Sequence, residues 1–244
     1  MSRKKGGGFW ETVRTVFYAI LVALFIRTFT YEPFNIPSGS MIPTLLVGDY
    51  LFVSKYSYGY SRHSFPLSFL PISNRIFFRE PERGDVAVFK LPRDNKTDYI
   101  KRIIGLPGDT VRMQAGRLFI NGNLVERIRV DDYLYKNSYD RQIHQARYIE
   151  TLPNGRGHYL LEEGDNRRFD NTREFKVPPG NYFMMGDNRD HSVDSRSEVG
   201  FVPVENFVGR AEIIFFSTDG SGDFWKFWTW PSATRFNRLF SDIE

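Results

Sequence analysis

After about residue 31 the chain consists of short apolar runs separated by glycine, proline, asparagine and aspartate, with no long run of helical periodicity. Runs of about four to eight residues bounded in this way predict β-strands. Asn121 and Gly122 separate two such runs and can supply the positive φ angles of a type I′ hairpin turn. We therefore expect a mostly β fold, closed as a folded barrel or as two packed sheets. The clearest strand candidates are residues 50–53, 85–91, 99–104, 110–113, 182–185 and 210–216.

Two stretches depart from this pattern. Residues 57–82 mix proline, serine and aromatic residues, and predict a long loop or an extended hairpin. Within them, residues 65–72 are apolar enough either to contact lipid or to form a small satellite core. Residues 114–177 are richer in charge and in turn residues, and we expect them to form a smaller inserted β subdomain.

Residues 15–26 carry no charge and are bounded by Arg14 and Arg27. A membrane-spanning helix needs about 20 residues, so a buried core helix or a signal-peptide segment are alternatives. The two arginines can extend their charged groups to headgroup level, and no small-residue cleavage site follows. We expect a single transmembrane signal-anchor, and the excess of Lys and Arg before it predicts a cytoplasmic N-terminus.

Composition narrows the classes of site and partner. The chain has no cysteine, which excludes disulfides, Cys-ligated zinc and a thiol nucleophile. Its net charge is +4, but the basic residues are spread thinly and no nucleic-acid-binding motif accompanies them. We therefore expect membrane lipid rather than nucleic acid as a partner. Five aromatic residues among residues 224–230 predict a tail that either packs on the body or, as we favour, lies at the bilayer interface.

A serine hydroxyl is a weak nucleophile that needs a base within hydrogen-bond reach. One histidine lies in an Asp-His-Ser run at residues 190–192, but neighbours in an extended run point in alternating directions and do not themselves form a triad. Lys101 lies in the strand candidate 99–104, where alternation places it on one face with Tyr99 and Ile103. Burial there would lower the pKa of the amine. The simpler alternative is an edge-strand lysine that reaches solvent.

Ser40 follows the anchor closely, in the small-residue run 38–40. It could simply cap a short helix predicted at residues 41–46. The same turn could also expose its Oγ and direct nearby backbone N–H groups towards a developing oxyanion, with Ser38 adding a hydroxyl donor. Together with Lys101, this pattern predicts an activated serine whose base is an amine.

Four blocks of sequence, in this order behind an N-terminal anchor, resemble those of bacterial type I signal peptidases. These are membrane-anchored serine endopeptidases that remove signal peptides from exported preproteins. The resemblance covers the soluble domain outside its insertions. The blocks are IPSGSMIPTL (36–45), RGDVAVF (83–89), YIKRIIGLPGD (99–109) and GDNRDHSVDSR (186–196), with GFVP (200–203) after the last.

The resemblance implies that Ser40 is the nucleophile and Lys101 the general base, with Ser38 and the backbone N–H of Ser40 as the oxyanion hole. It implies an acyl-enzyme mechanism without a metal or a cofactor. Ser192 matches a serine that orients the lysine, and Asp194 and Arg196 match a supporting ion pair. Shallow apolar pockets for small side chains at the first and third positions before the cut are implied for Ile36, Met41, Leu45, Tyr99 and Ile100.

The same resemblance implies a protein of the bacterial inner membrane with its catalytic domain on the periplasmic side, and the one apolar segment of this chain predicts a single pass. Its expected partners are exported preproteins and membrane lipid, and we expect a monomer. We expect a cytoplasmic N-terminus and anchor in residues 1–30, a catalytic β domain in 31–113 and 178–218, the inserted subdomain in 114–177, and the aromatic tail in 219–244.

Two other functions fit parts of this pattern. A Ser-Lys peptidase could be dedicated to one or a few secretion-system or pilin-like precursors. Alternatively, an anchored β scaffold could bind emerging apolar segments without cleaving them, although this leaves Ser40 and Lys101 unexplained. The chain departs from many relatives in having one expected transmembrane helix rather than two, and His191 lies where another polar residue, often Asn, is found.

Overall fold

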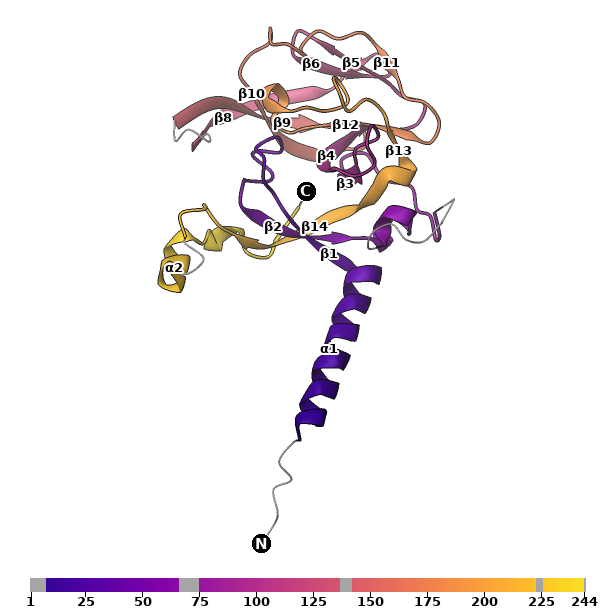
Figure 1. Cartoon of the computed structure of the whole chain (residues 1–244). Coiled ribbons are helices and arrows are strands. Elements are labelled where there is room, and N and C mark those ends of the chain that lie inside the picture. Colours follow the sequence, from indigo (N-terminus) through magenta and orange to yellow (C-terminus); the bar gives the residue numbers. More distant parts are fainter. Residues whose placement is uncertain (1–7, 66–74, 137–141, 223–225, 244) are drawn as a thin grey trace.

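The computed structural model describes residues 8–65, 75–136, 142–222 and 226–243. An N-terminal helix, α1 (Phe9–Phe29), stands apart from the folded body and leads directly into the first strand (Figure 1). Its 21 residues include neither proline nor glycine. At about 1.5 Å per residue the helix is ~31 Å long, close to the thickness of the hydrocarbon core of a bilayer.

The composition of α1 also suits a membrane. Its apolar window has a mean hydropathy of 1.6, and none of that window is buried in the protein. The helix is therefore long and apolar enough to cross a membrane. It is longer than the uncharged run of residues 15–26 because the residues on either side of that run continue the helical hydrogen bonding.

The rest of the chain is mostly β, as predicted, and every strand pairing within the sheets is antiparallel. The main sheet has the order β1-β2-β14-β3-β4-β12-β13, and β15 pairs with β14. Its strands are β1 (Tyr31–Asn35), β2 (Asp49–Ser54), β3 (Val86–Lys90), β4 (Asp98–Gly105), β12 (Asn181–Met185), β13 (Val202–Pro203), β14 (Phe207–Ser217) and β15 (Ser241–Asp242).

Two smaller sheets lie on the side of the molecule away from α1 (Figure 1). The predicted Asn-Gly turn is confirmed: Asn121 and Gly122 have φ angles of 52° and 77° and connect β6 to β7. The first small sheet contains β8 (Glu126–Lys136), β9 (Gln142–Thr151) and β10 (Gly157–Glu162); the second contains β5 (Thr110–Gln114), β6 (Arg117–Ile120), β7 (Asn123–Leu124) and β11 (Phe175–Lys176).

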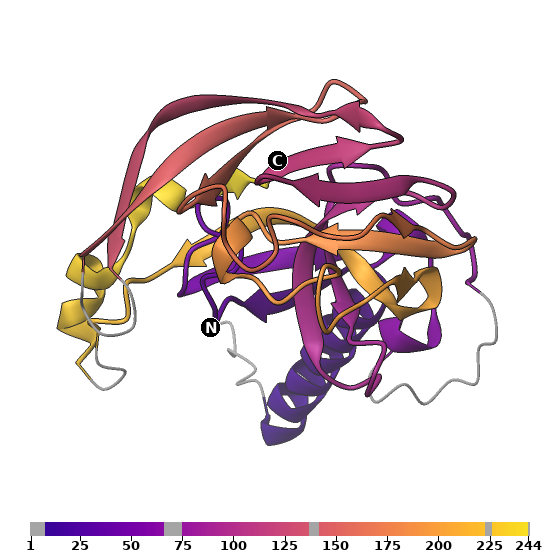
Figure 2. The same ribbon diagram turned by 90° about the horizontal axis from the view of Figure 1, so that it is seen from above.

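Short helical turns connect these strands. Figures 1 and 2 show that the β8–β9 hairpin extends to the same side of the molecule as the C-terminal turn α2. The turns are η1 (Tyr56–Tyr58), η2 (Arg62–Ser64), η4 (Arg189–His191), η5 (Val204–Asn206), η6 (Phe227–Thr229), α2 (Trp230–Ala233) and η7 (Phe236–Arg238).

The second small sheet shares a core with the main sheet. Val111 and Leu118 on the small sheet belong to the same buried cluster as Ile104 and Met185 on β4 and β12. β5 and β6 also form one hairpin, so the expected boundary between residues 113 and 114 falls inside a hairpin. The division into a catalytic domain and an inserted subdomain stays a prediction.

The C-terminal tail packs against the body. β15 pairs with β14 at Ile213 and Ile214, and Arg238 forms an ion pair with Asp49. Several large side chains of the tail are nevertheless exposed, namely Trp228, Trp230, Phe236 and Phe240. Contact between the tail and lipid stays a prediction. The apolar segment 65–72 falls, apart from Phe65, outside the described residues.

Candidate active site

Ser40 lies in the loop that connects β1 to β2, which we call the serine loop (residues 36–48). The base of this loop is closed by Ile36, whose N–H donates to Asp49 O at 2.9 Å and whose O accepts from Gly48 N at 3.0 Å. Inside it, Leu45 N donates to Met41 O at 2.9 Å, which forms a single helical turn in place of the short helix expected at residues 41–46. Met41 and Leu45 are fully buried in the core, and they anchor the turn that begins at Ser40.

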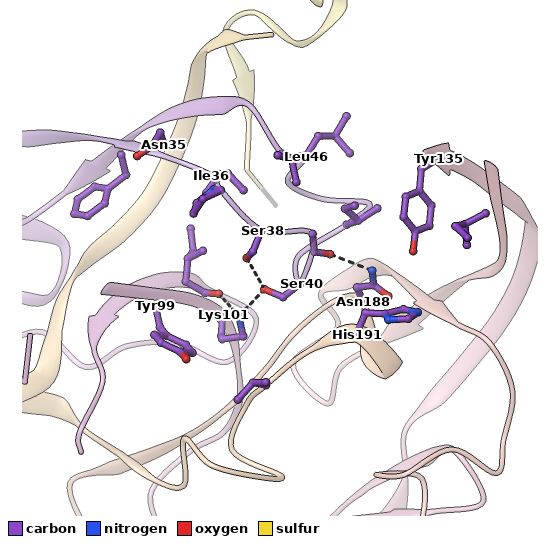
Figure 3. A pocket seen from close by; sticks show the side chains of 18 of the residues that line it. Asn35, Ile36, Ser38, Ser40, Leu46, Tyr99, Lys101, Tyr135, Asn188 and His191 are labelled. Carbon is purple, nitrogen blue, oxygen red and sulfur yellow. Dashed lines mark hydrogen bonds between the residues drawn. The ribbon is translucent and has the colours of Figure 1, made fainter. Parts of the chain in front are cut away.

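The structure brings Ser40 and Lys101 together (Figure 3). Lys101 Nζ donates to Ser40 Oγ at 2.7 Å and to Ile100 O at 2.9 Å. Lys101 lies on β4, where it pairs with Ala87 of β3, and its Nζ lies 5.5 Å from the centre of the Tyr99 ring. The residue is 3% exposed. The expected lysine with an apolar, buried setting is therefore present, and it is within hydrogen-bond reach of a serine.

The environment of Lys101 disfavours its charged form. Burial lowers the pKa of the amine from 10.5 to about 8, although the carboxylates of Asp194 and Asp187 act in the opposite direction. A group with this pKa is partly deprotonated close to neutral pH, so it can accept a proton from the serine hydroxyl.

Ser38 lies beside the serine hydroxyl, and its Oγ is 3.5 Å from Ser40 Oγ (Figure 3). Its hydroxyl is therefore close to the place where an oxyanion would develop on a carbonyl attacked by Ser40.

The structure places Ser192 near the site but shows no hydrogen bond from it to Lys101. Its Oγ is buried and has no hydrogen-bond partner among the described residues. It packs on Gly186, where an added Cβ would lie 2.2 Å from Ser192 Oγ and 2.5 Å from Ser40 O. Gly186 therefore permits the close approach of these two segments. The lysine-orienting role of Ser192 stays a prediction.

Asp194 and Arg196 form a fully buried ion pair behind the site, with Arg196 Nε and Nη2 donating to the carboxylate at 3.0 and 2.8 Å. Burial alone would raise the pKa of Asp194, but the charge and hydrogen bonds of Arg196 hold it below its usual value. The same carboxylate accepts from Gly186 N at 3.1 Å. The pair therefore fixes the backbone that packs against the serine loop.

Asn188 is a site residue that the sequence reasoning missed. Its backbone N–H donates to Ser40 O at 3.1 Å, and its side-chain amide donates to Gly39 O at 3.0 Å (Figure 3). Its Oδ1 accepts from Gln145 on β9 at 3.1 Å. Asn188 therefore fixes the first half of the serine loop. Its place in the block 186–196 was a signal, but only the fold shows which loop it contacts.

Asp187 holds the same loop further along. It accepts from Thr44 Oγ1 at 2.6 Å and from two nitrogens of Arg102 at 2.9 and 2.8 Å. All the oxygens and nitrogens of this ion pair lie in side chains that are about 2% exposed. Arg102 follows Lys101 directly on β4, so this strand carries both the lysine of the site and a residue that supports the serine loop.

A cavity of about 1360 Å³ opens onto Ser40 and Lys101. Of the five expected pocket residues, Ile36, Tyr99 and Ile100 line it. Met41 and Leu45 instead lie in the core beneath the serine loop, where neither is exposed. The opposite wall comes from the β8–β9 hairpin through Tyr133, Leu134, Tyr135 and Ile143.

His191, the histidine of the Asp-His-Ser run, lies away from the pair of Ser40 and Lys101. His191 Nε2 lies 2.8 Å from Glu163 Oε1 on the exposed rim of the cavity, rather than against Ser40. Among the residues that the structure describes, no group of three or more His, Asp or Glu side chains could hold a metal ion.

A buried lysine amine that is hydrogen-bonded to a serine hydroxyl beside a groove is the arrangement expected of a serine hydrolase whose base is an amine. The family described as "Signal peptidase, peptidase S26" matches residues 9–216 of the chain. The signal peptidases I of Rickettsia conorii and Rickettsia typhi are each 42% identical to it over 245 residues, covering 93% of this chain and 90% of the relative. The chain therefore belongs to the signal peptidase family S26, as the sequence blocks predicted, and is a peptidase.

Two further matches are also signal peptidases I. The signal peptidase I of Rickettsia canadensis is 40% identical over 245 residues, with the same coverage. A crystal structure of a signal peptidase I from Enterococcus faecalis V583 is 28% identical and covers 54% of this chain and 97% of its own. Its TM-score is 0.32, which is too low to support a comparison of the two folds.

Proposed function

We propose that this protein removes signal peptides from exported preproteins, using Ser40 as nucleophile and Lys101 as general base. One observation carries the proposal: the 2.7 Å hydrogen bond between Lys101 Nζ and Ser40 Oγ, made by a lysine whose burial lowers its pKa to about 8. Membership of the signal peptidase family supports the choice of substrate.

The reaction is acyl transfer. The neutral amine of Lys101 accepts the hydroxyl proton while Ser40 Oγ attacks the scissile carbonyl carbon. The backbone N–H of Ser40 and the hydroxyl of Ser38 stabilise the oxyanion that forms. The ammonium of Lys101 then protonates the leaving amine as the peptide bond breaks. In the second half, Lys101 takes a proton from a water molecule as that water attacks the acyl carbon. The bond from this carbon to Ser40 Oγ then breaks, Lys101 returns the proton to Oγ, and the signal peptide leaves with a new carboxylate.

The groove favours small side chains next to the cut. Ile36 and Ile100 line the groove that contains Ser40, and family membership implies shallow apolar pockets at these positions. A substrate in extended conformation places alternate side chains on the same face, which here would be the first and third residues before the cut. We therefore expect alanine and other small residues at both positions.

The membrane anchor determines on which side of the membrane the site lies. β1 begins two residues after α1 ends, and the serine loop follows β1 directly (Figure 1). With the N-terminus in the cytoplasm, the catalytic domain faces the periplasmic side of the bacterial inner membrane. A monomer that also contacts lipid can then meet a preprotein whose own signal peptide is still in the bilayer.

The direct test uses the full-length protein purified in detergent and incubated with a signal-bearing precursor. Mass spectrometry of the new N-terminus should show one cut after a small residue. Ser40→Ala and Lys101→Ala should each lower the rate by at least about a thousandfold. The exposed residues Thr151 and Lys176 provide alanine controls that remove a hydroxyl and an amine away from the site, and both variants should keep the parent rate.

Activity that persists in Lys101→Ala would remove the proposed base. A panel of unrelated precursors separates general processing from a peptidase dedicated to one or a few of them, because only the general enzyme cleaves most of the panel.

A further inference from the structure

The second half of the serine loop is held by the C-terminal segment, which lies beyond the family match at residues 9–216. Arg238 Nη2 donates to Thr44 O at 2.9 Å. The same guanidinium binds Asp49 at the end of the loop, with Nη2 to Oδ2 at 2.6 Å and Nε to Oδ1 at 3.1 Å. One side chain from the tail therefore contacts the loop both four residues after Ser40 and at its base.

Asp49 connects these contacts to the body. It is fully buried, and its carboxylate also accepts from Leu46 N at 2.8 Å and from Ser217 Oγ at 2.6 Å. A buried carboxylate needs a charged partner and hydrogen bonds to offset its lost hydration. Arg238 is the partner that meets it with two nitrogens, so the tail neutralises the charge at the base of the serine loop.

A second arginine of the tail contacts the serine loop at Val47, three residues after Thr44. Arg235 Nη1 donates to Val47 O at 3.0 Å and to Ser217 Oγ at 3.3 Å. The next loop residue, Gly48, has a φ of 90°, and a Cβ there would lie 2.1 Å from Thr218 O. Thr218 N donates to Gly48 O at 3.0 Å. The end of the serine loop therefore packs directly on the start of the tail.

The tail is itself fixed to the body, so it can hold the loop in place. Phe240 N donates to Ile214 O at 2.7 Å, and Arg235 N donates to Ser217 O at 3.0 Å. Arg235 also lines the cavity that contains Ser40, together with Asp219 and Ser221. The tail is thus part of the wall of the groove as well as a support for the loop.

We propose that residues 217–222 and 226–243 act as a positioning element for the catalytic serine, with Arg238 as its main positioning residue. Asn188 and Asp187 hold one side of the serine loop, and the tail holds the other. This inference rests on the proposed role of Ser40. A reacting oxygen displaced by about 1 Å can cost a factor of ~100 in rate, so loosening the loop lowers turnover even in a folded enzyme.

The test compares three variants of the full-length protein in detergent. Arg238→Met removes the guanidinium and keeps the length of the side chain. Arg238→Lys keeps the charge, but a single ammonium cannot reproduce the planar guanidinium hydrogen bonds to Thr44 O and to both oxygens of the Asp49 carboxylate. Arg93→Met is the control, because Arg93 and its one described partner, Glu198, are both 74% exposed and 3.9 Å apart.

We expect Arg238→Met to lower kcat about tenfold or more, with KM changed less than about twofold, at a temperature where circular dichroism shows the protein folded. Arg238→Lys should fall between it and the parent, and Arg93→Met should match the parent. The pH midpoint of kcat/KM should stay that of the parent, because Lys101 keeps its surroundings. Hydrogen exchange should rise in residues 41–49 and not in residues 99–104.

A folded Arg238→Met or Arg238→Lys enzyme with the parent kcat would overturn the inference. If neither variant folds, Arg235→Met decides it. It removes the contacts to Val47 O and Ser217 Oγ and a longer ion pair with Asp49 at 3.9 Å, leaves Arg238 bound to Asp49, and should still lower kcat about threefold. The proposed function is tested separately. If the Ser40→Ala enzyme is active, Ser40 is not the nucleophile and the proposed function fails. If Ser40→Ala is inactive while Arg238→Met is fully active, only the positioning role is refuted.

Discussion

Replacing Lys101 with methionine should reveal the energetic cost of keeping an amine in the core. Burial lowers the pKa of Lys101 from 10.5 to about 8. That difference of about 2.5 pH units, at about 1.36 kcal/mol per unit, corresponds to ~3 kcal/mol of folding stability. The residue is 3% exposed, so solvent screening reduces this figure little. Burying the amine is therefore a substantial cost at neutral pH.

The direction of the effect follows from proton binding. Between about pH 8 and about pH 10.5 the unfolded chain holds the proton on Lys101 and the folded protein does not, so stability rises with pH across this window. Below about pH 8 the full cost is present. Methionine lacks the hydrogen bonds of Nζ to Ser40 and Ile100, which are worth roughly 1 kcal/mol each. At any single pH, this loss partly offsets the stability gained by removing the buried amine. The pH dependence of the difference is the informative quantity.

The assay is urea unfolding of the full-length parent and Lys101→Met proteins in the same detergent, followed by far-ultraviolet circular dichroism at a series of pH values. Subtracting the two free energies of unfolding removes the other titrating groups. The parent should gain about 3 kcal/mol relative to the variant between about pH 7 and about pH 10.5. A difference that stays flat within about 0.5 kcal/mol over this range would refute the depressed pKa.

Three further predictions follow from the geometry. The rate of precursor cleavage, measured in steady-state assays, should rise with pH through a midpoint near about 8, because Lys101 must lose its proton. Ser38→Ala should lower kcat about 100- to 1000-fold with little change in KM, and an unchanged kcat would exclude its hydroxyl from the oxyanion hole. Arg102→Met leaves the buried Asp187 carboxylate without its partner and should lower the free energy of unfolding by about 3–5 kcal/mol; a urea midpoint equal to the parent's would contradict this.

The apolar strands of the fold were predictable because burial on at least one face leaves a hydrophobic pattern in the sequence. β8 and β9 were not located individually, although residues 114–177 were expected to form a β subdomain. Most of their side chains are exposed or half-buried, and cross-strand ion pairs such as Arg147 with Asp131 stabilise them. Such strands lack the apolar alternation that marks a half-buried strand. β1 was missed for another reason: Pro33 argues against a strand, but β1 lies at the edge of the main sheet, where proline is tolerated.

The reacting residues of the site were easier to predict from the sequence than the residues that hold the serine loop in place. Residue type and setting made Ser40 and Lys101 candidates, each with a simpler alternative, because a lysine on an apolar strand face would have a perturbed pKa. The resemblance to signal peptidases then implied their roles. The contacts of Asn188 with Gly39, and of Arg238 with Thr44, join segments that are about 150 to 190 residues apart in sequence. No local pattern encodes such pairings, so only the folded chain reveals them.

The most direct test of the account is the pKa of Lys101 itself. A titration of the full-length protein in detergent, with lysine labelled with ¹³C at Cε and the signal assigned by its loss in Lys101→Met, measures this value by NMR. We expect a midpoint of about 8 for Lys101. A midpoint for Lys101 near 10.5, the ordinary value for lysine, would contradict the proposed mechanism.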